Sequence, residues 1–85
     1  MPTVMPLEML DCGEWAEVVD VSGAPDWVGR MAEIGLQAGT RLRMLQPGSP
    51  CLFQMGHCRL SLRLEDAMQI LVQPLTLPAL AAEGV

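Results

Sequence analysis

The sequence predicts a mainly β domain in which about five short antiparallel strands close into a small barrel with one short α-helix. Two observations lead to this fold class. Turns rich in glycine and proline divide the chain into short segments, five of which have apolar residues at strand spacing. A single stretch, residues 26–34, has apolar residues at helical spacing instead. The length of 85 residues suits one domain with a small core.

The first predicted strand covers residues 14–21, after an Asp-Cys-Gly turn. Its alternation is imperfect, because Ala16 and Val18 fall on one face while Val19 and Val21 fall on the other. An irregularity of this kind is typical of a strand with an extra residue. We therefore expect a β-bulge or a strong twist here.

The predicted helix covers residues 26–34. Asp26 stands where an N-cap carboxylate would accept the first free backbone N–H groups. Gly35 directly follows the last apolar helical residue, and a glycine there readily adopts the left-handed conformation that ends many helices. We therefore expect the helix to begin after Asp26 and to end at Gly35.

Residues 40–46 form the next predicted strand. Leu42 and Met44 alternate with Arg41 and Arg43, which is the period of a half-buried strand with a basic outer face. The Pro-Gly-Ser-Pro sequence that follows is expected to be an irregular loop, because its prolines fix φ and remove backbone donors.

Residues 51–62 form a predicted hairpin whose register follows from its turn. A two-residue Gly56-His57 loop suits a type II′ turn, with glycine at the position that needs a positive φ. The resulting pairs are Cys51 with Leu62, Leu52 with Ser61, Phe53 with Leu60, Gln54 with Arg59, and Met55 with Cys58. The first, third and fifth pairs share one face, which we expect to be the core face.

The chain after the hairpin predicts a single helical turn near residues 64–68 and a closing strand over residues 69–73. Together these elements correspond to a small antiparallel barrel of the SH3-like kind. We expect residues 1–73 to form this barrel. Residues 74–85 are expected to form an apolar C-terminal tail, which either docks on the barrel or on a neighbouring copy, or remains disordered.

The charge of the chain argues against nucleic acid as a partner. Ten acidic residues and five basic ones, with no lysine, give a formal net charge of −5, which phosphate groups would repel. No segment is apolar over the length of a membrane span, and the first residues lack a basic signal-peptide region. We therefore expect a cytoplasmic protein that does not itself span the membrane.

The sequence does not predict an enzyme or a required cofactor. It has one histidine and no serine or cysteine beside a suitable base, so a nucleophile, a base and an orienting group do not come together. A weak divalent-metal site, for iron or zinc, is a separate hypothesis with Cys12 and His57 as its ligands. Cys12 lies in a turn with Asp11 and Glu14, where thiolate and carboxylates suit such ions. Without closely spaced ligand pairs, the site would be weak or shared between two chains.

The three cysteines are expected to be free thiols. Cys51 and Cys58 would lie at opposite ends of the core face of the hairpin, beyond the separation of about 7 Å between Cα atoms that a disulfide allows. A thiol on that face acts as a small apolar side chain. His57, at the tip of the same hairpin, is expected to be a solvated turn residue if it binds no metal.

The order and spacing of several short motifs resemble the ferrous-iron transport protein A family, FeoA. The motifs are Leu10 with Gly13 and Val18, the run RMAEIGL from Arg30 to Leu36, Gly39-Thr40, Gly48 with Pro50, and the run LSLR from Leu60 to Arg63 with Ala67. The resemblance extends from about Leu7 to Val72. It implies a small stand-alone SH3-like protein that assists the large membrane GTPase permease of bacterial ferrous-iron uptake, at the inner face of the membrane.

An accessory domain changes the activity of a transporter by binding one of its conformations. Trp and Arg are enriched among interface hot spots, so the candidate partner-binding residues are Trp27 and Arg30 on the helix and Arg41 and Arg43 on the following strand. The alternative for Trp27 is a position in the core. The sequence also leaves open whether the protein forms a homodimer.

Two other classes of function remain as alternatives. FeoA-like domains resemble the SH3-like C-terminal regulatory domain of metal-dependent repressors, a role that needs a DNA-binding domain beyond these 85 residues. A binder of proline-rich peptides normally uses a groove lined by aromatic side chains. Two tryptophans and no tyrosine are too few to line such a groove.

Overall fold

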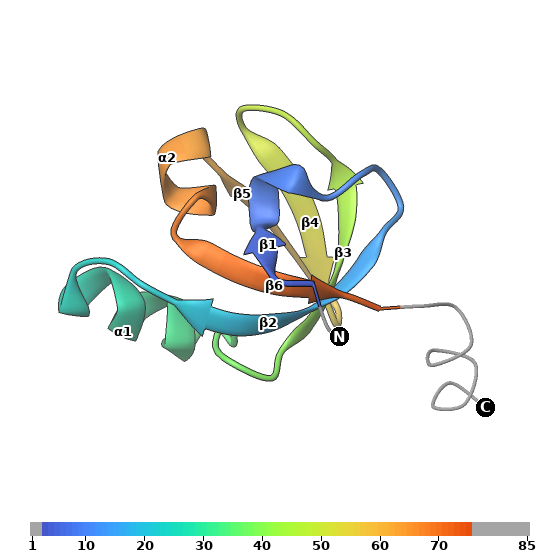
Figure 1. The fold of residues 1–85 in the computed structure, drawn as a ribbon. Helices are drawn as coiled ribbons and strands as arrows, with labels where there is room; N and C mark the ends of the chain where they lie inside the picture. Colours follow the sequence, from blue (N-terminus) through green and yellow to red (C-terminus); the bar gives the residue numbers. More distant parts are fainter. Residues whose placement is uncertain (1–2, 76–85) are drawn as a thin grey trace.

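The structure, a computed structural model, describes residues 3–75. One curled sheet of six antiparallel strands has the order β1-β6-β2-β3-β4-β5 (Figure 1). The strands are β1 (Met5–Pro6), β2 (Trp15–Val21), β3 (Arg41–Gln46), β4 (Cys51–Met55), β5 (Cys58–Leu62) and β6 (Ile70–Pro74). The helical elements are the 3₁₀ turn η1 (Leu7–Met9) and the helices α1 (Pro25–Glu33) and α2 (Leu64–Ala67). The predicted mainly β class, with one helix and a helical turn, is therefore confirmed.

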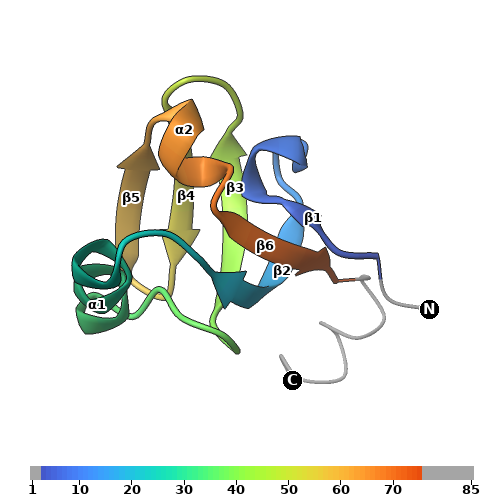
Figure 2. The ribbon, with the colours of Figure 1, turned by 60° about the vertical axis from the view of Figure 1, so that its left-hand side comes forward.

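The sheet contains all five predicted strands and one short strand that the sequence analysis did not predict. This extra strand, β1, pairs with Val72 and Leu71 of β6. Strands β1 and β5 are the two edges of the sheet within residues 3–75, and the sheet curls around the core between them (Figure 2). Strand β6 includes Pro74, and the N–H of Leu75 donates to the carbonyl oxygen of Trp15 at 2.9 Å. The rest of the predicted tail, residues 76–85, lies outside the described residues.

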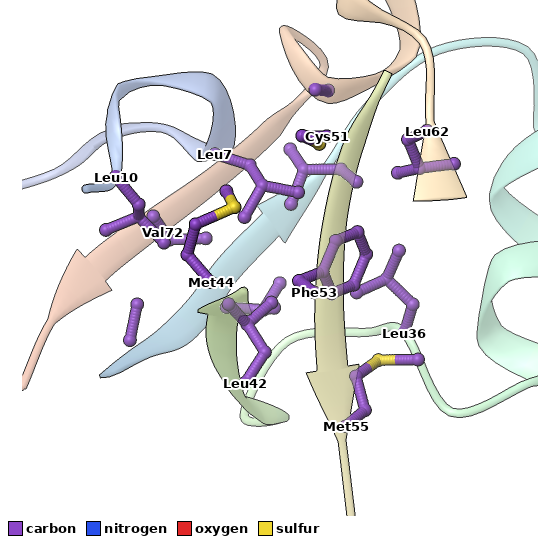
Figure 3. Close-up of a cluster of buried hydrophobic side chains, with 14 residues drawn as sticks. Leu7, Leu10, Leu36, Leu42, Met44, Cys51, Phe53, Met55, Leu62 and Val72 are labelled. Atoms are coloured by element: carbon purple, nitrogen blue, oxygen red, sulfur yellow. The ribbon is translucent and has the colours of Figure 1, made fainter. Parts of the chain in front are cut away.

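The core lies inside the curl of the sheet and is built almost entirely from aliphatic and sulfur-containing side chains around one phenylalanine (Figure 3). Phe53 of β4 is fully buried, and Leu42 and Met44 of β3 point inward as the alternation predicts. The remaining fully or nearly fully buried residues are Leu7, Leu10, Ala16, Val18, Leu36, Cys51, Met55, Leu62, Ala67, Ile70 and Val72. No described helix is long and apolar enough to cross a membrane.

Strand β2 contains the predicted bulge, but the bulge changes which side chains face the core. Its register against β6 shifts after Val18, so that Val19 has no opposing residue and is 41% exposed. Val18 opposes Val72 and Val21 opposes Ile70, which puts both valines on the core side. The prediction that Val21 shares the outer face of Val19 was therefore wrong. Because Val19 is an extra residue in the strand, the side chain of Val21, two positions after it, points toward the core.

Helix α1 begins earlier than predicted, at Pro25 and not after Asp26. Its N-cap is Ala24, which has extended backbone angles and makes no side-chain capping bond, and Pro25 occupies the first turn. Proline suits this position, because its φ is already helical and its missing N–H would have no partner inside the helix. Asp26 was therefore wrongly predicted as the N-cap. It lies in the first turn, where its negative charge still favours the positive end of the helix dipole.

The C-terminal end of α1 is the one predicted. Gly35 has a φ of 98°, and its N–H donates to the carbonyl of Ala32 at 3.0 Å. The N–H of Leu36 donates to the carbonyl of Met31 at 2.8 Å. These two bonds define a Schellman motif, which requires a left-handed residue after the helix. Leu36 is fully buried, so this motif also inserts a side chain from the helix end into the core.

The hairpin of β4 and β5 has the predicted register in all five pairs. Gly56 has a φ of 56°, and no non-glycine residue in the described part of the chain has a positive φ, which agrees with the predicted type II′ turn. One prediction about this hairpin was wrong, because Cys58 is exposed and not part of the core. Cys58 is the first residue of the edge strand β5. Leu62, the last residue of that strand, is buried, so the start of β5 extends past the core.

Candidate functional site

The outer face of the sheet brings both predicted strand arginines together with a tryptophan. Trp15 of β2 directly opposes Arg43 of β3. The Cζ atom of Arg43 lies 5.8 Å from the centroid of the Trp15 ring, within the range of a cation–π interaction. The Nε–H of Arg43 also donates to the carbonyl oxygen of Gly13 at 3.4 Å. The Arg43 side chain is therefore held between the indole and the turn that precedes β2.

Arg41 lies on the same face, two residues along β3. Its Nε atom is 3.7 Å from Oε1 of Glu17, the residue that opposes it on β2. Both side chains are about 40% exposed, so water and salt screen their attraction, and an exposed pair of this kind contributes about 0–1 kcal/mol.

A groove of about 310 Å³ lies on this face. Its lining residues are Trp15, Arg41, Arg43, Gln54 and Gly56. Gln54 of β4 opposes Arg43, and its Nε2 atom donates to the carbonyl oxygen of Gly56 at 2.9 Å. This bond restrains the side-chain amide of Gln54, which lines the groove. The groove thus combines an aromatic ring, two cations and an amide, a set of groups suited to bind an anionic segment.

The other two predicted contact residues lie on α1, outside this groove. Trp27 is half-buried and packs against the core, whereas Arg30 is exposed. Figure 1 shows α1 following the C-terminal end of β2, while Trp15 stands at the start of that strand. The predicted partner-binding residues therefore belong to two separate places, a helix and a groove.

Trp15 is the groove residue that the sequence analysis did not select. Its position on the outer face follows from alternation with buried Ala16, which sequence reasoning could have used. Its contact with Arg43 depends on the register between β2 and β3, which no local turn sets. This register pairs two residues that are 28 positions apart in the sequence (43 − 15), so it can be determined only from the three-dimensional fold.

The two predicted metal ligands lie at different places on the sheet. The Sγ–H of Cys12 donates to the carbonyl oxygen of Leu45, near the C-terminal end of β3, at 3.1 Å. His57 is exposed at the tip of the β4–β5 hairpin, beyond Met55 and therefore near the opposite end of β3. The two positions are at least three residues apart along the strand direction, or about 10 Å at 3.3 Å per residue. One ion cannot bind both side chains of a single chain.

The carboxylates near Cys12 do not complete a metal site either. Glu14 turns its Oε1 atom back to accept the N–H of Asp11 at 2.8 Å, which stabilises the turn. Among residues 3–75, no three or more His, Cys, Asp or Glu side chains are close enough to hold one ion. These residues do not fit a closed metal centre within one chain, and a weak site between two chains stays a prediction.

The described cysteines are all free, as predicted. Cys51 is buried in the core, and burial raises the pKa of its thiol, with smaller opposing effects from backbone hydrogen bonds. Cys12 and Cys58 are exposed. Reactivity toward solutes is therefore expected to be concentrated at these two positions.

Comparison with known proteins agrees on one family. The FeoA domain model matches residues 5–74. FeoA of Chlorobium tepidum is 32% identical with a TM-score of 0.79, over 85% of this chain and 71% of that protein. FeoA of Stenotrophomonas maltophilia is 32% identical with a TM-score of 0.71, over 80% of this chain and 88% of that protein. The latter was solved with zinc and is described as a prokaryotic SH3 domain protein and a candidate activating factor of ferrous iron transport.

A manganese-dependent transcriptional repressor has the same fold at lower identity. It is 23% identical with a TM-score of 0.78, and the match covers 88% of this chain but only 44% of the repressor. At that identity the likeness concerns the fold alone. No curated protein matches the chain significantly in sequence.

Proposed function

Because the chain belongs to the FeoA family and is an SH3-like domain, we propose that it is an accessory protein of bacterial ferrous-iron uptake that binds the membrane iron permease with its GTPase domain. The observation that carries this proposal is the family match, which extends over residues 5–74 and thus over every described strand and helix. The protein would act in the cytoplasm, at the inner face of the membrane, through this partner.

The proposed mechanism is binding without catalysis. A protein that binds one conformation of a transporter more tightly than another shifts the transporter toward that conformation. The candidate contact residues are Arg41 and Arg43 in the groove and Arg30 on α1. Trp27 is less suited to a pure contact role, because its packing against the core ties it to the stability of the domain. Removing Trp27 would therefore change folding and binding together.

The test is co-purification of the tagged protein with the ferrous-iron permease from detergent-solubilised bacterial membranes. We expect the unmodified protein to retain the permease. Arg30→Glu and Arg43→Glu should each reduce the retained amount several-fold. The melting temperature should stay unchanged in Arg30→Glu, whose side chain is exposed, and fall only slightly in Arg43→Glu, which loses the contacts with Trp15 and Gly13.

A matched control is Arg63→Glu, which makes the same change in charge at a side chain that is 81% exposed and lies 3.9 Å from Glu65 in an exposed ion pair. Equal losses in all three variants would indicate a general charge effect. Failure of the unmodified protein to retain any permease would refute the proposal.

Divalent metal enters this proposal only as a weak and optional ligand. Cys12 and His57 of two chains would supply the donors, and iron or zinc would be the ion. Retention of the permease should then be the same with and without a chelator. A Cys12→Ser variant should bind the permease normally and lose any zinc-dependent increase in apparent mass.

A second function is favoured by the likeness to the manganese-dependent repressor, namely an SH3-like regulatory module for a metal-responsive regulator. This role predicts a different partner, because the tagged protein would retain a DNA-binding protein from the soluble fraction in a manganese-dependent manner. Retention of the permease alone would exclude it.

A further inference from the structure

Four side chains form a row across the outer face of β2, β3, β4 and β5. Trp15 opposes Arg43, Arg43 opposes Gln54, and Gln54 opposes Arg59. Directly opposed residues of antiparallel strands point to the same side of the sheet. We call Trp15, Arg43, Gln54 and Arg59 the outer-face row. Its two arginines are separated by two strand spacings, or about 10 Å.

The outer-face row is positively charged on a protein whose formal net charge is −5. Including Arg41, three of the five arginines in the chain lie on this face. The nearby carboxylates do not neutralise it, because Glu17 pairs with Arg41 and Glu14 turns back to the Asp11 amide. The guanidinium of Arg59 makes no ion pair or hydrogen bond within the described part of the chain.

Two of the four side chains of the row, Arg43 and Gln54, are held in place before any ligand arrives, whereas Arg59 is not. Arg43 is held by the Gly13 carbonyl and the Trp15 ring, and its terminal nitrogen atoms remain available. Gln54 is held by the Gly56 carbonyl. Binding to fixed side chains loses less conformational entropy than binding to mobile ones.

We propose that the outer-face row binds a short acidic peptide segment of a partner protein. Two carboxylates of the segment, about 10 Å apart, pair with Arg43 and Arg59, since guanidinium and carboxylate groups form charge-assisted bonds. An apolar side chain of the segment contacts the ring of Trp15, a residue that is 36% exposed. The overall negative charge of the protein disfavours nucleic acid as the ligand. Only the assignment of this segment to the iron permease rests on the function proposed above.

A synthetic peptide tests the site without the permease. In polyproline II conformation, residues three apart lie on one side with a separation of about 9 Å, which matches the two arginines. The probe is the acetylated and amidated peptide GELPELPEG, titrated into ¹⁵N-labelled protein. We expect the indole N–H signal of Trp15 to shift, while that of Trp27 stays in place as an internal control. The affinity should fall with added salt.

Matched variants separate a specific site from a general charge effect. Arg43→Gln and Arg59→Gln should each weaken peptide binding by roughly three- to tenfold. Arg63→Gln removes the same charge from an exposed position away from the row and should leave binding unchanged. The peptide GQLPQLPQG, in which glutamine replaces glutamate, should not bind.

Three results would overturn the proposal. These are an unshifted Trp15 signal at millimolar peptide, equal weakening by Arg63→Gln, or tighter binding of single-stranded DNA than of the acidic peptide. If the peptide binds normally and the permease is not retained, the acidic-peptide site stands and the proposed permease partner is wrong. If the permease is retained and the peptide does not bind, the row is not the contact.

Discussion

Two glycines of the same helical segment should respond in opposite directions to the same substitution. Gly29 lies inside α1 with ordinary helical angles, whereas Gly35 follows the helix with a φ of 98°. At both positions an added Cβ would meet no atom within 4 Å, so crowding does not distinguish them. The backbone conformation alone therefore decides the sign of the change in stability.

The expected magnitudes follow from that difference. Gly35→Ala places a Cβ in the left-handed region, which costs about 1–2 kcal/mol. Gly29→Ala removes backbone freedom from the unfolded chain and stabilises the domain by up to about 1 kcal/mol. The two variants should therefore differ by about 1–3 kcal/mol. Gly35→Asn should lie between Gly35→Ala and the unmodified protein, because asparagine tolerates this conformation better than alanine.

Urea unfolding followed by circular dichroism measures these differences directly. The denaturant dependence of the free energy of unfolding should be the same in all variants, since none changes the buried surface appreciably. In thermal unfolding, 1 kcal/mol corresponds to about 4–8 °C for a domain of this size. Gly35→Ala should lower the midpoint and Gly29→Ala should raise it.

The reasoning is refuted if both midpoints move in the same direction. It is also refuted if Gly35→Ala has no effect, because the Schellman bonds would then form without a left-handed residue. A loss of stability in Gly29→Ala would show that the added Cβ is crowded, which contradicts the open space around Gly29.

Three further outcomes are expected. Phe53→Ala should destabilise the domain by about 3–5 kcal/mol, because this fully buried ring is the largest side chain of the core, and Phe53→Leu should cost clearly less in the same urea assay. A thiol reagent should modify Cys12 and Cys58 rapidly in the folded protein and Cys51 only on unfolding, so three rapid modifications under native conditions would contradict the burial of Cys51. Because burial raises the pKa of Cys51 in the folded state, the unfolded chain releases this proton first as the pH rises. The free energy of unfolding contributed by this thiol is therefore fully present below the ordinary thiol pKa of about 8.5 and falls above it, and Cys51→Ala should remove that decrease when urea midpoints are compared from neutral to alkaline pH.

Local sequence determined the features whose causes lie within a few residues. The register of the β4–β5 hairpin follows from a two-residue turn with a glycine, and every pair agrees with it. The end of α1 follows from Gly35, because only a residue that tolerates a positive φ allows both Schellman bonds. The order of the motifs also identified the family, since it reflects the same succession of turns and strands.

Tertiary structure decided the features that depend on distant parts of the chain. Val21 faces the core because β6 sets where the extra residue of β2 is accommodated. Cys58 is exposed because β5 is an edge strand that extends past the core, which the hairpin pattern alone does not reveal. Trp15 contacts Arg43 only through the pairing of β2 with β3. Periodicity indicates which face a side chain takes, but only long-range strand pairing determines its neighbours on that face.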